Sequence, residues 1–264
     1  MKATESFFVH ISDPQFGMYR PGDEDYEETA LVEKAVERIN ALAPSFVICT
    51  GDLIDVPGSD RQMAHARRML AKLAPGIPLL ITPGNHDIGD VPTPSDLGWY
   101  RRRVGRDWFS FNHRRWHFVG LNSCLMAAGE LAPADADYQW AWLEDDLESH
   151  AGADNTGTIV FMHHPLFLRR SKEMEDYFNL PRPARDRCLD LFRCYGIRTV
   201  LAGHLHRCNE AVCGDLSVVV TGPVGMPLGE ACSGLRIVRF DDRAIHHRFF
   251  ALDDVAGQES FVAR

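Results

Sequence analysis

The sequence predicts an α/β protein in which the last third of the chain completes a second β-sheet. Runs of β-branched and aromatic residues recur along the whole chain, and amphipathic helical patterns lie between several of them in its earlier part. After the last of these helical patterns, the chain contains strand-like runs alone. Alternating strands and helices are typical of an α/β core, whereas strands that follow one another directly add to a sheet. With no internal repeat and no linker of low complexity, residues 1–264 are expected to form a single domain.

The strands are predicted wherever a short apolar run rich in Val, Ile and Phe is bounded by turn-forming residues. Such runs cover residues 6–12, 45–50, 78–82, 117–122, 158–163, 198–202, 217–221, 235–240 and 244–250.

The helices are predicted from apolar residues that repeat at three- and four-residue spacing. The clearest pattern covers residues 27–42, where one face carries Leu31, Val32, Ala35, Val36, Ile39 and Leu42 and the other face is charged. Similar patterns cover residues 61–73, 138–147 and 185–195.

The composition limits the classes of function. A chain of 264 residues with 45% hydrophobic content can bury a sizeable core. The net charge of −9 argues against binding to nucleic acid or to an anionic membrane, because proteins of those classes usually present a basic surface. No stretch reaches the roughly 20 apolar residues of a membrane span, and the first apolar run is too short for a signal peptide. We therefore expect a cytoplasmic protein that binds neither nucleic acid nor a membrane. The oligomeric state stays open.

Five predicted strands end in residues that bind metals or transfer protons. The five exits read DPQ at 13–15, GDLID at 51–55, GNHD at 84–87, HHP at 163–165 and GHLH at 203–206. Each motif alone is more often an ordinary turn or helix cap. Open α/β sheets bind their ligands at the carboxyl ends of the strands, so five such exits together predict one chemical site.

This set of motifs resembles the calcineurin-like metallophosphoesterase superfamily, whose usual pattern is DxH, GDxxD, GNHD, a histidine and GHxH. The resemblance implies a sandwich of two mixed β-sheets flanked by helices. More narrowly, the segments DPQFG, HHPLFL and DYFNL are similar to those of a group of protein serine/threonine phosphatases within the superfamily. That narrower likeness covers nearly the whole chain.

The resemblance also implies a role for each residue of the motifs. One metal ion would be held by Asp13, Gln15, Asp52 and His206, and a second by Asp52, Asn85, His163 and His204. A hydroxide that bridges the two ions would attack the phosphorus, and the ions would stabilise the attacking and leaving oxygens. His86 would protonate the leaving oxygen, with Asp87 orienting it. Two dications, two carboxylates and a hydroxide sum to a charge of about +1, which attracts a phosphate locally.

Gln15 departs from the pattern of the wider superfamily, which has a histidine at this position. An amide oxygen is a harder and weaker donor than an imidazole nitrogen, so we expect Mn²⁺, with Mg²⁺, Fe and Zn²⁺ as alternatives. The same glutamine occurs in the narrower phosphatase group and in manganese-dependent ADP-ribose and CDP-alcohol diphosphatases.

Three functions therefore stay open on the sequence. The first is hydrolysis of phosphomonoesters, including phosphoserine and phosphothreonine in proteins. The second is a phosphodiesterase or nucleotide diphosphatase with the same metal centre. The third is a metal-binding scaffold without catalysis, which the complete motif set disfavours.

A long connection after His163 carries the remaining functional prediction. Residues 166–186 mix charged and aromatic side chains without clear periodicity, which is typical of a functional lid or of a solvated loop. As a lid, this segment would place Tyr177, Phe178 and Asn179 over the entrance to the site, where they would contact the substrate. His164 is expected to pack beside the ligands without being one.

Overall fold

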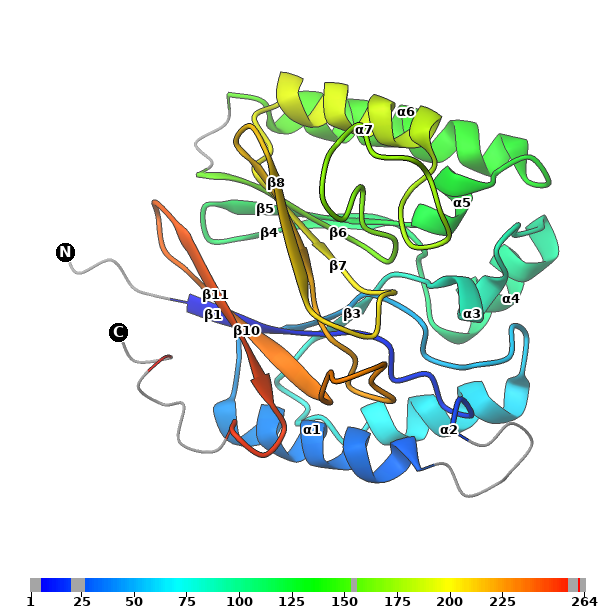
Figure 1. Ribbon diagram of the computed structural model, residues 1–264, viewed down its shortest axis with the longest axis vertical. Coiled ribbons are helices and arrows are strands. Elements are labelled where there is room, and N and C mark those ends of the chain that lie inside the picture. The colour runs from blue at the N-terminus through cyan, green and yellow to red at the C-terminus, as the bar shows by residue number, and fades with distance from the viewer. Residues whose placement is uncertain (1–5, 20–26, 153–155, 256–260, 262–264) are drawn as a thin grey trace.

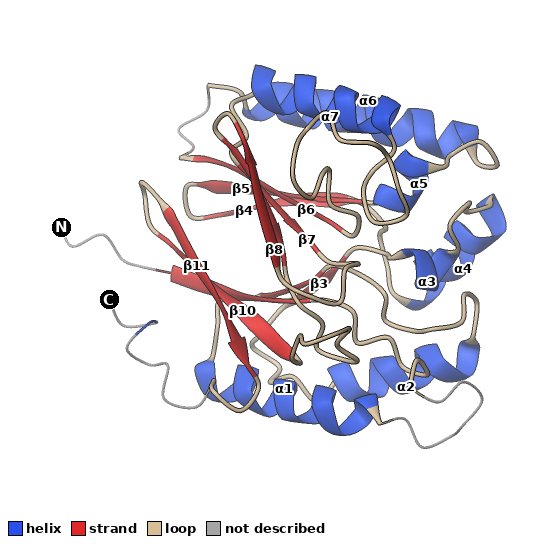
Figure 2. Cartoon of the chain, in the orientation of Figure 1, coloured by secondary structure: helices blue, strands red, loops and turns tan. Residues whose placement is uncertain are grey.

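Two β-sheets lie face to face in the computed structural model, and helices cover the outer face of each sheet (Figures 1 and 2). The structure describes residues 6–19, 27–152, 156–255 and 261. This arrangement confirms the predicted sandwich of two mixed sheets flanked by helices. None of the described helices is both long and apolar enough to cross a membrane.

The first sheet has five strands in the order β11-β10-β1-β2-β3. Its three parallel strands are β1 (Ser6–Ile11), β2 (Val47–Cys49) and β3 (Leu79–Ile81). The antiparallel strands β10 (Gly234–Phe240) and β11 (Ile245–Ala251) extend the sheet beyond β1. Two helices pack on its outer face: α1 (Glu28–Leu42) and α2 (Asp60–Leu70).

The second sheet has six strands in the order β4-β5-β6-β7-β9-β8. Its central strands β5 (Trp116–Leu121), β6 (Gly157–Met162), β7 (Thr199–Ala202) and β9 (Leu216–Val220) are parallel. The antiparallel strands β4 (Phe109–His113) and β8 (Asn209–Cys213) form its two edges. Its outer face is covered by α6 (Pro133–His150) and α7 (Arg182–Cys194). Three short helices complete the fold: α3 (Asn85–Ile88), α4 (Pro94–Arg103) and α5 (Ser123–Ala127).

An aromatic core holds the two sheets together. Phe8 of β1 stacks on Phe46 with ring centroids 4.9 Å apart, and it forms an edge-to-face pair with Phe118 of β5 at a centroid distance of 5.7 Å. Phe161 of β6 and Phe240 of β10 belong to the same buried cluster. Because offset and edge-to-face ring pairs stabilise a core beyond the area they bury, this layer fixes how the sheets face each other.

Two strands and the assignment of the late strands differ from the sequence prediction. β4 and β8 are edge strands whose sequences FSFNH and NEAVC contain too many polar residues to form an apolar run. The last third of the chain does not only complete the second sheet: β8 and β9 do so, whereas β10 and β11 return to the first sheet beside β1. Hydrophobic patterning identifies a strand but does not say which sheet takes it.

The helix boundaries also differ in places. α6 begins at Pro133, five residues earlier than the predicted 138, because proline suits the first turn of a helix. α7 begins at Arg182 after Pro181 and so shortens the predicted connection 166–186. α2 ends at Leu70 and not at 73.

Candidate metal centre

The five predicted exits meet in one buried cluster between the two sheets. Asp13 follows β1, Asp52 follows β2 and Asn85 follows β3, while His163 follows β6 and the pair His204 and His206 follows β7. These strands run parallel within each sheet, so the motifs emerge at their carboxyl ends. All seven predicted ligands are buried: Asp13, Gln15, Asp52, Asn85, His163, His204 and His206.

Ligand-type atoms gather in two groups that share Asp52. One group contains Asp52, His163 and His204, and the other contains Asp13, Asp52 and His206. His163 Nε2 lies 3.2 Å from Asp52 Oδ2 and 3.0 Å from Asn85 Oδ1. His206 Nε2 lies 3.6 Å from Asp13 Oδ1. This grouping matches the two ligand sets that the motifs imply, with Asp52 between them.

Backbone carbonyls fix the ring orientation of all three histidines. His163 Nδ1 donates to Thr50 O at 2.7 Å, His204 Nε2 to Tyr177 O at 2.8 Å, and His206 Nδ1 to Met226 O at 2.6 Å. A carbonyl only accepts, so these nitrogens carry a hydrogen, and the opposite nitrogens carry lone pairs whenever the rings are in the neutral form that binds a metal ion. His163 Nε2 and His204 Nδ1 face each other at 3.1 Å. Lone pairs that converge in this way are the arrangement of a cation site.

Gln15 presents its amide oxygen in the same way. Its Nε2 donates to Asp55 Oδ1 at 3.2 Å, which directs Oε1 away from that carboxylate. This buried oxygen has no hydrogen-bond partner among the described residues. Leaving a buried carbonyl oxygen unpaired destabilises the folded protein by about 1–3 kcal/mol, and a cation bound by this oxygen would remove that cost. The donors present therefore fit two divalent ions.

The backbone at the ligands is strained. Five of the seven have positive φ angles: Asp13 (52°), Gln15 (38°), Asp52 (50°), His204 (73°) and His206 (51°). Residues with side chains rarely adopt this left-handed region, and each instance costs on the order of 1–3 kcal/mol. The surrounding fold holds these turns in place, which is typical of a functional site.

Close packing explains two glycines of the motifs. A Cβ on Gly84 would lie 2.1 Å from Asp52 Oδ1, and a Cβ on Gly203 would lie 1.8 Å from Ser12 Oγ. Side chains at either position would therefore displace the carboxylates or the loops that carry the ligands. His204 N donates to Asp13 Oδ1 at 3.1 Å across this contact, joining the exits of β7 and β1.

The electrostatics of the cluster favour positive charge at its centre. Burial opposes the imidazolium form of His163, but the Asp52 and Asp13 carboxylates outweigh it and raise the pKa of His163 to about 9. Burial and the neighbouring His163 lower the pKa of His204 to about 4. Burial would raise the pKa of Asp52, but His163 holds it below its usual range. The field of two buried carboxylates thus attracts a cation although each of them is desolvated.

His86 lies at the rim of the cluster and is about one-third exposed. Its Nδ1 donates to Asp55 O at 2.7 Å, so Nε2 is the nitrogen available to a substrate. Burial disfavours its charge, but the carboxylate of Asp52 and the carbonyl of Asp55 raise the pKa of His86 overall. These features suit a group that gives a proton near neutral pH.

Asp87 makes its hydrogen bonds to backbone groups beside His86, and its predicted orienting role stays a prediction. Its Oδ1 accepts from Leu53 N at 2.8 Å and its Oδ2 from Gly84 N at 2.9 Å, and the two side chains share no hydrogen bond or ion pair among the described residues. Asp87 instead ties the exits of β2 and β3 together. Asp55 contacts the His86 ring directly, through its carbonyl. Sequence reasoning gave Asp55 no role, although its place in GDLID marked it.

The connection after His163 reaches the cluster with two of its three predicted residues. Tyr177 OH accepts from Asn85 Nδ2 at 3.0 Å, and the Tyr177 and Phe178 rings lie 4.8 and 5.8 Å from the His204 ring. Asn179 is different: it is buried, accepts from Arg185 and donates to Glu173 and Met174 O. The hydrogen bonds of Asn179 hold the loop together, and a contact between Asn179 and substrate stays a prediction.

A buried cation organises this connection. Arg185 is fully buried and donates to the carbonyls of Leu180, Ser171 and Glu173 as well as to Asn179. The Glu173 carboxylate accepts from the backbone N–H groups of residues 168–170. The segment is thus an ordered rim beside the cluster, held by its own hydrogen bonds.

Two further histidine groups are not ligands of the cluster. His164 shares a hydrogen bond with Ser123 Oγ at 2.9 Å and packs behind His204, as expected. His117, Asp146 and His150 also lie close together near α6. The rings of His117 and His150 are stacked with centroids 3.7 Å apart, so their in-plane lone pairs cannot aim at one ion.

The fold and this cluster together define a metal-dependent phosphoesterase. The chain belongs to the calcineurin-like phosphoesterase family, whose model matches residues 8–208. It is 35% identical over 266 residues to the serine/threonine-protein phosphatase CPPED1 of Bos taurus, covering 95% of this chain and 85% of that protein. The human counterpart is 35% identical over 267 residues with the same shares. These relatives support a phosphatase activity of the hydrolase class.

A solved structure confirms the architecture. The purple acid phosphatase PPD1 from Lupinus luteus superposes with a TM-score of 0.73 over 96% of this chain and 52% of its own, at 15% sequence identity. At this identity the likeness concerns the fold alone.

Proposed function

We propose that this chain hydrolyses phosphomonoesters with two divalent metal ions, Mn²⁺ in the first place, and that its substrates include phosphoserine and phosphothreonine in proteins. The observation that carries the proposal is that metal-binding side-chain atoms gather in two groups, and that both groups include Asp52. The named activity of the CPPED1 relatives supports the protein substrates.

The residues divide the work. Asp13, Gln15 and His206 would hold one ion and Asn85, His163 and His204 the other, with Asp52 common to both. When bound, two such ions polarise a phosphoryl group and activate water for attack. The carbonyls of Thr50, Tyr177 and Met226 accept hydrogen bonds from the three histidine rings and so hold the rings in the orientation that metal binding requires.

His86 is proposed to give a proton to the leaving oxygen from Nε2. Its Nδ1 is fixed by the Asp55 carbonyl at 2.7 Å, so the ring cannot turn away from the rim. A positioned proton donor of this kind contributes roughly 10² to 10⁴ in rate. Tyr177 and Phe178 would contact the group that carries the phosphate, because they cover the His204 side of the entrance.

The experiment that tests this function compares four substrates at a fixed Mn²⁺ concentration: p-nitrophenyl phosphate, its bis-ester, a phosphoserine peptide and ADP-ribose. We expect both monoesters to be hydrolysed well above the bis-ester and ADP-ribose. Faster turnover of the bis-ester or of ADP-ribose would assign the site to a diesterase or diphosphatase. Metal analysis of the reconstituted protein should give two ions per chain, and one ion or none would contradict the two-metal centre.

A further inference from the structure

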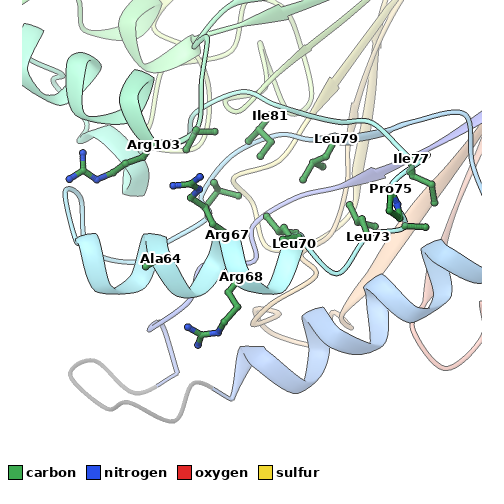
Figure 3. A pocket seen from close by; sticks show the side chains of 14 residues that line it. Ala64, Arg67, Arg68, Leu70, Leu73, Pro75, Ile77, Leu79, Ile81 and Arg103 are labelled. Carbon is green, nitrogen blue, oxygen red and sulfur yellow. The ribbon is translucent and has the colours of Figure 1, made fainter.

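An apolar groove lies along the free edge of β3, outside the metal centre. It encloses about 610 Å³ between α2 with the turn that follows it and the edge of the first sheet. Figure 3 shows Leu70 and Leu73 on one side of the groove and Leu79 and Ile81 on the other, with Arg67 and Arg103 at one end. A smaller hollow of about 160 Å³ adjoins the groove at the same strand: it shares Leu79, Ile81 and Val104 with the groove and is also lined by Leu80 and Phe109.

The backbone of β3 is available on this side. β3 is the last strand of its sheet and pairs only with β2. Val47 N donates to Pro78 O and Thr82 N donates to Cys49 O, which places the groups of every second residue toward β2. The N–H and C=O groups of Leu79 and Ile81 therefore point outward, since neighbouring residues of a strand alternate. Exposed edges of this kind pair with an added strand.

The two hollows match the side chains of such a strand. Leu79 and Ile81 pack in the core beneath α1 and α2, whereas Leu80 packs in the layer between the sheets. A strand added to β3 would likewise point alternate side chains to the two sides of the first sheet. One set would enter the larger groove, and the other would enter the hollow at Phe109.

The charge around the groove selects the partner. Arg67, Arg68, Arg103 and Arg106 line the two hollows, and no Asp or Glu lines either of them. Arg103 is paired with Asp60, and Arg68 is hydrogen-bonded to His65. Arg67 and Arg106 are exposed and have no ion pair in the part of the chain that the structure describes. On a protein of net charge −9, this local excess of arginine favours an acidic ligand.

We propose that this groove docks an extended segment of a partner protein, with alternating apolar side chains flanked by acidic residues. The segment adds a strand to β3, places its apolar side chains in the two hollows and directs its carboxylates to Arg67 and Arg106. β3 leads through Thr82 and Pro83 directly into the GNHD turn that carries Asn85 and His86. The docked partner is thus held on the strand next to the metal centre without occupying it. This binding does not depend on the proposed hydrolysis.

The probe is a fluorescent peptide of about ten residues in which valine and threonine alternate between glutamate-rich ends. Fluorescence anisotropy with the full chain measures its affinity. We expect Arg67→Glu with Arg106→Glu to weaken binding by about tenfold or more. Ala71→Trp, which fills the groove from the end of α2, should weaken it as well. The control Arg193→Glu with Arg243→Glu changes the net charge equally on distant exposed sites and should bind as the wild type does.

Two versions of the peptide separate the contributions. In the first version, N-methylation of alternate residues removes backbone donors of the peptide and should abolish binding. In the second version, lysines replace the glutamates of the peptide, which should also abolish binding. Far-ultraviolet circular dichroism and urea unfolding should be unchanged in all variants, which shows that they fold whether or not the chain hydrolyses p-nitrophenyl phosphate. The proposal is overturned if the peptide does not bind, or if neither the arginine pair nor Ala71→Trp affects it. A dimer in sedimentation that the arginine variant dissociates would assign the groove to a second copy of the chain.

Discussion

The side-chain amide of Gln15 is held by the carboxylate of Asp55, with Nε2 and Oδ1 3.2 Å apart. This contact uses the amide nitrogen and leaves the buried carbonyl oxygen of Gln15 without a hydrogen-bond partner among the described residues, so that this oxygen can coordinate a cation. The same Asp55 fixes His86 through its carbonyl. One residue therefore links a proposed metal ligand with the proposed proton donor.

Gln15→His is expected to tighten the first metal site and to shift its preference toward Zn²⁺, because an imidazole nitrogen replaces a harder and weaker oxygen. Calorimetric titration with Mn²⁺ and Zn²⁺ measures the change. Gln15→Leu, which removes the donor at similar volume, should weaken the same site. If both variants bind both metals as the wild type does, Gln15 is not a ligand.

His86→Ala is expected to lower turnover by roughly 10² to 10⁴ while leaving the metal content unchanged, because the ring lies beside the ligand groups and is not one of them. Asp52→Asn should lose both activity and metal, since Asp52 is common to the two groups. Turnover of p-nitrophenyl phosphate and elemental analysis are measured on the same preparations. Equal loss of metal in the two variants would show that the roles are not separate.

Replacing Tyr177 and Phe178 with Ala is expected to change the ratio of phosphopeptide to p-nitrophenyl phosphate turnover several-fold, since contacts worth about 1–3 kcal/mol with the larger substrate are lost. The internal hydrogen bonds around Arg185 should keep the rest of the loop in place. Tyr177→Phe, which removes only the hydroxyl near Asn85, is the matched control for the ring. An unchanged ratio in the double variant would exclude this rim from substrate recognition.

His10 is expected to make the protein less stable as the pH falls below about 6.5. It is fully buried between the hydroxyls of Thr50 and Thr221, and burial, with Arg236 and then His247 nearby, lowers its pKa well below the usual value. Below about pH 6.5 the unfolded chain takes up a proton that the folded chain does not, so the free energy of unfolding falls by up to about 1.4 kcal/mol per pH unit.

His10→Gln should remove this dependence while keeping a side chain that can bond both hydroxyls. Urea unfolding is measured between about pH 7.5 and 5.5 with a chelator present, so that metal binding does not contribute. The stability curves of the wild type and the variant should approach each other as the pH falls. Parallel curves would mean that His10 is protonated in the folded protein as easily as in the unfolded chain.

The sequence predicted the cluster well because its information is local. Each motif follows its own strand, and parallel strands bring their carboxyl ends together, so no long-range knowledge is needed to place Asp52 near Asn85. The role of Asp55 toward His86 could not be predicted in this way, because a backbone carbonyl contact has no residue signature. The burial of Arg185 could not be predicted either, because a charged residue in a helical pattern normally faces water and not a buried loop.

The fold was predictable to the level of layers but not of strand order. β4 and β8 are edge strands with mixed polarity, which tertiary pairing stabilises more than their own composition does. β10 and β11 read as ordinary late strands, and nothing in their sequence says that they pair with a strand at the other end of the chain. Their position follows from the antiparallel register between β1 and β10.

The position of β10 beside β1 also sets an order of events during synthesis. β1 carries Asp13 and Gln15 at its end, and its partner on one side is a strand of residues 234–240. While the ribosome is still making that part of the chain, one edge of β1 has no strand to pair with and is open to a chaperone or to a neighbouring nascent chain. The six-stranded sheet, in contrast, is complete once residue 220 has emerged. Asp13 and Gln15 are therefore among the first ligands to be translated, whereas the strand that closes this edge of β1 is among the last to emerge.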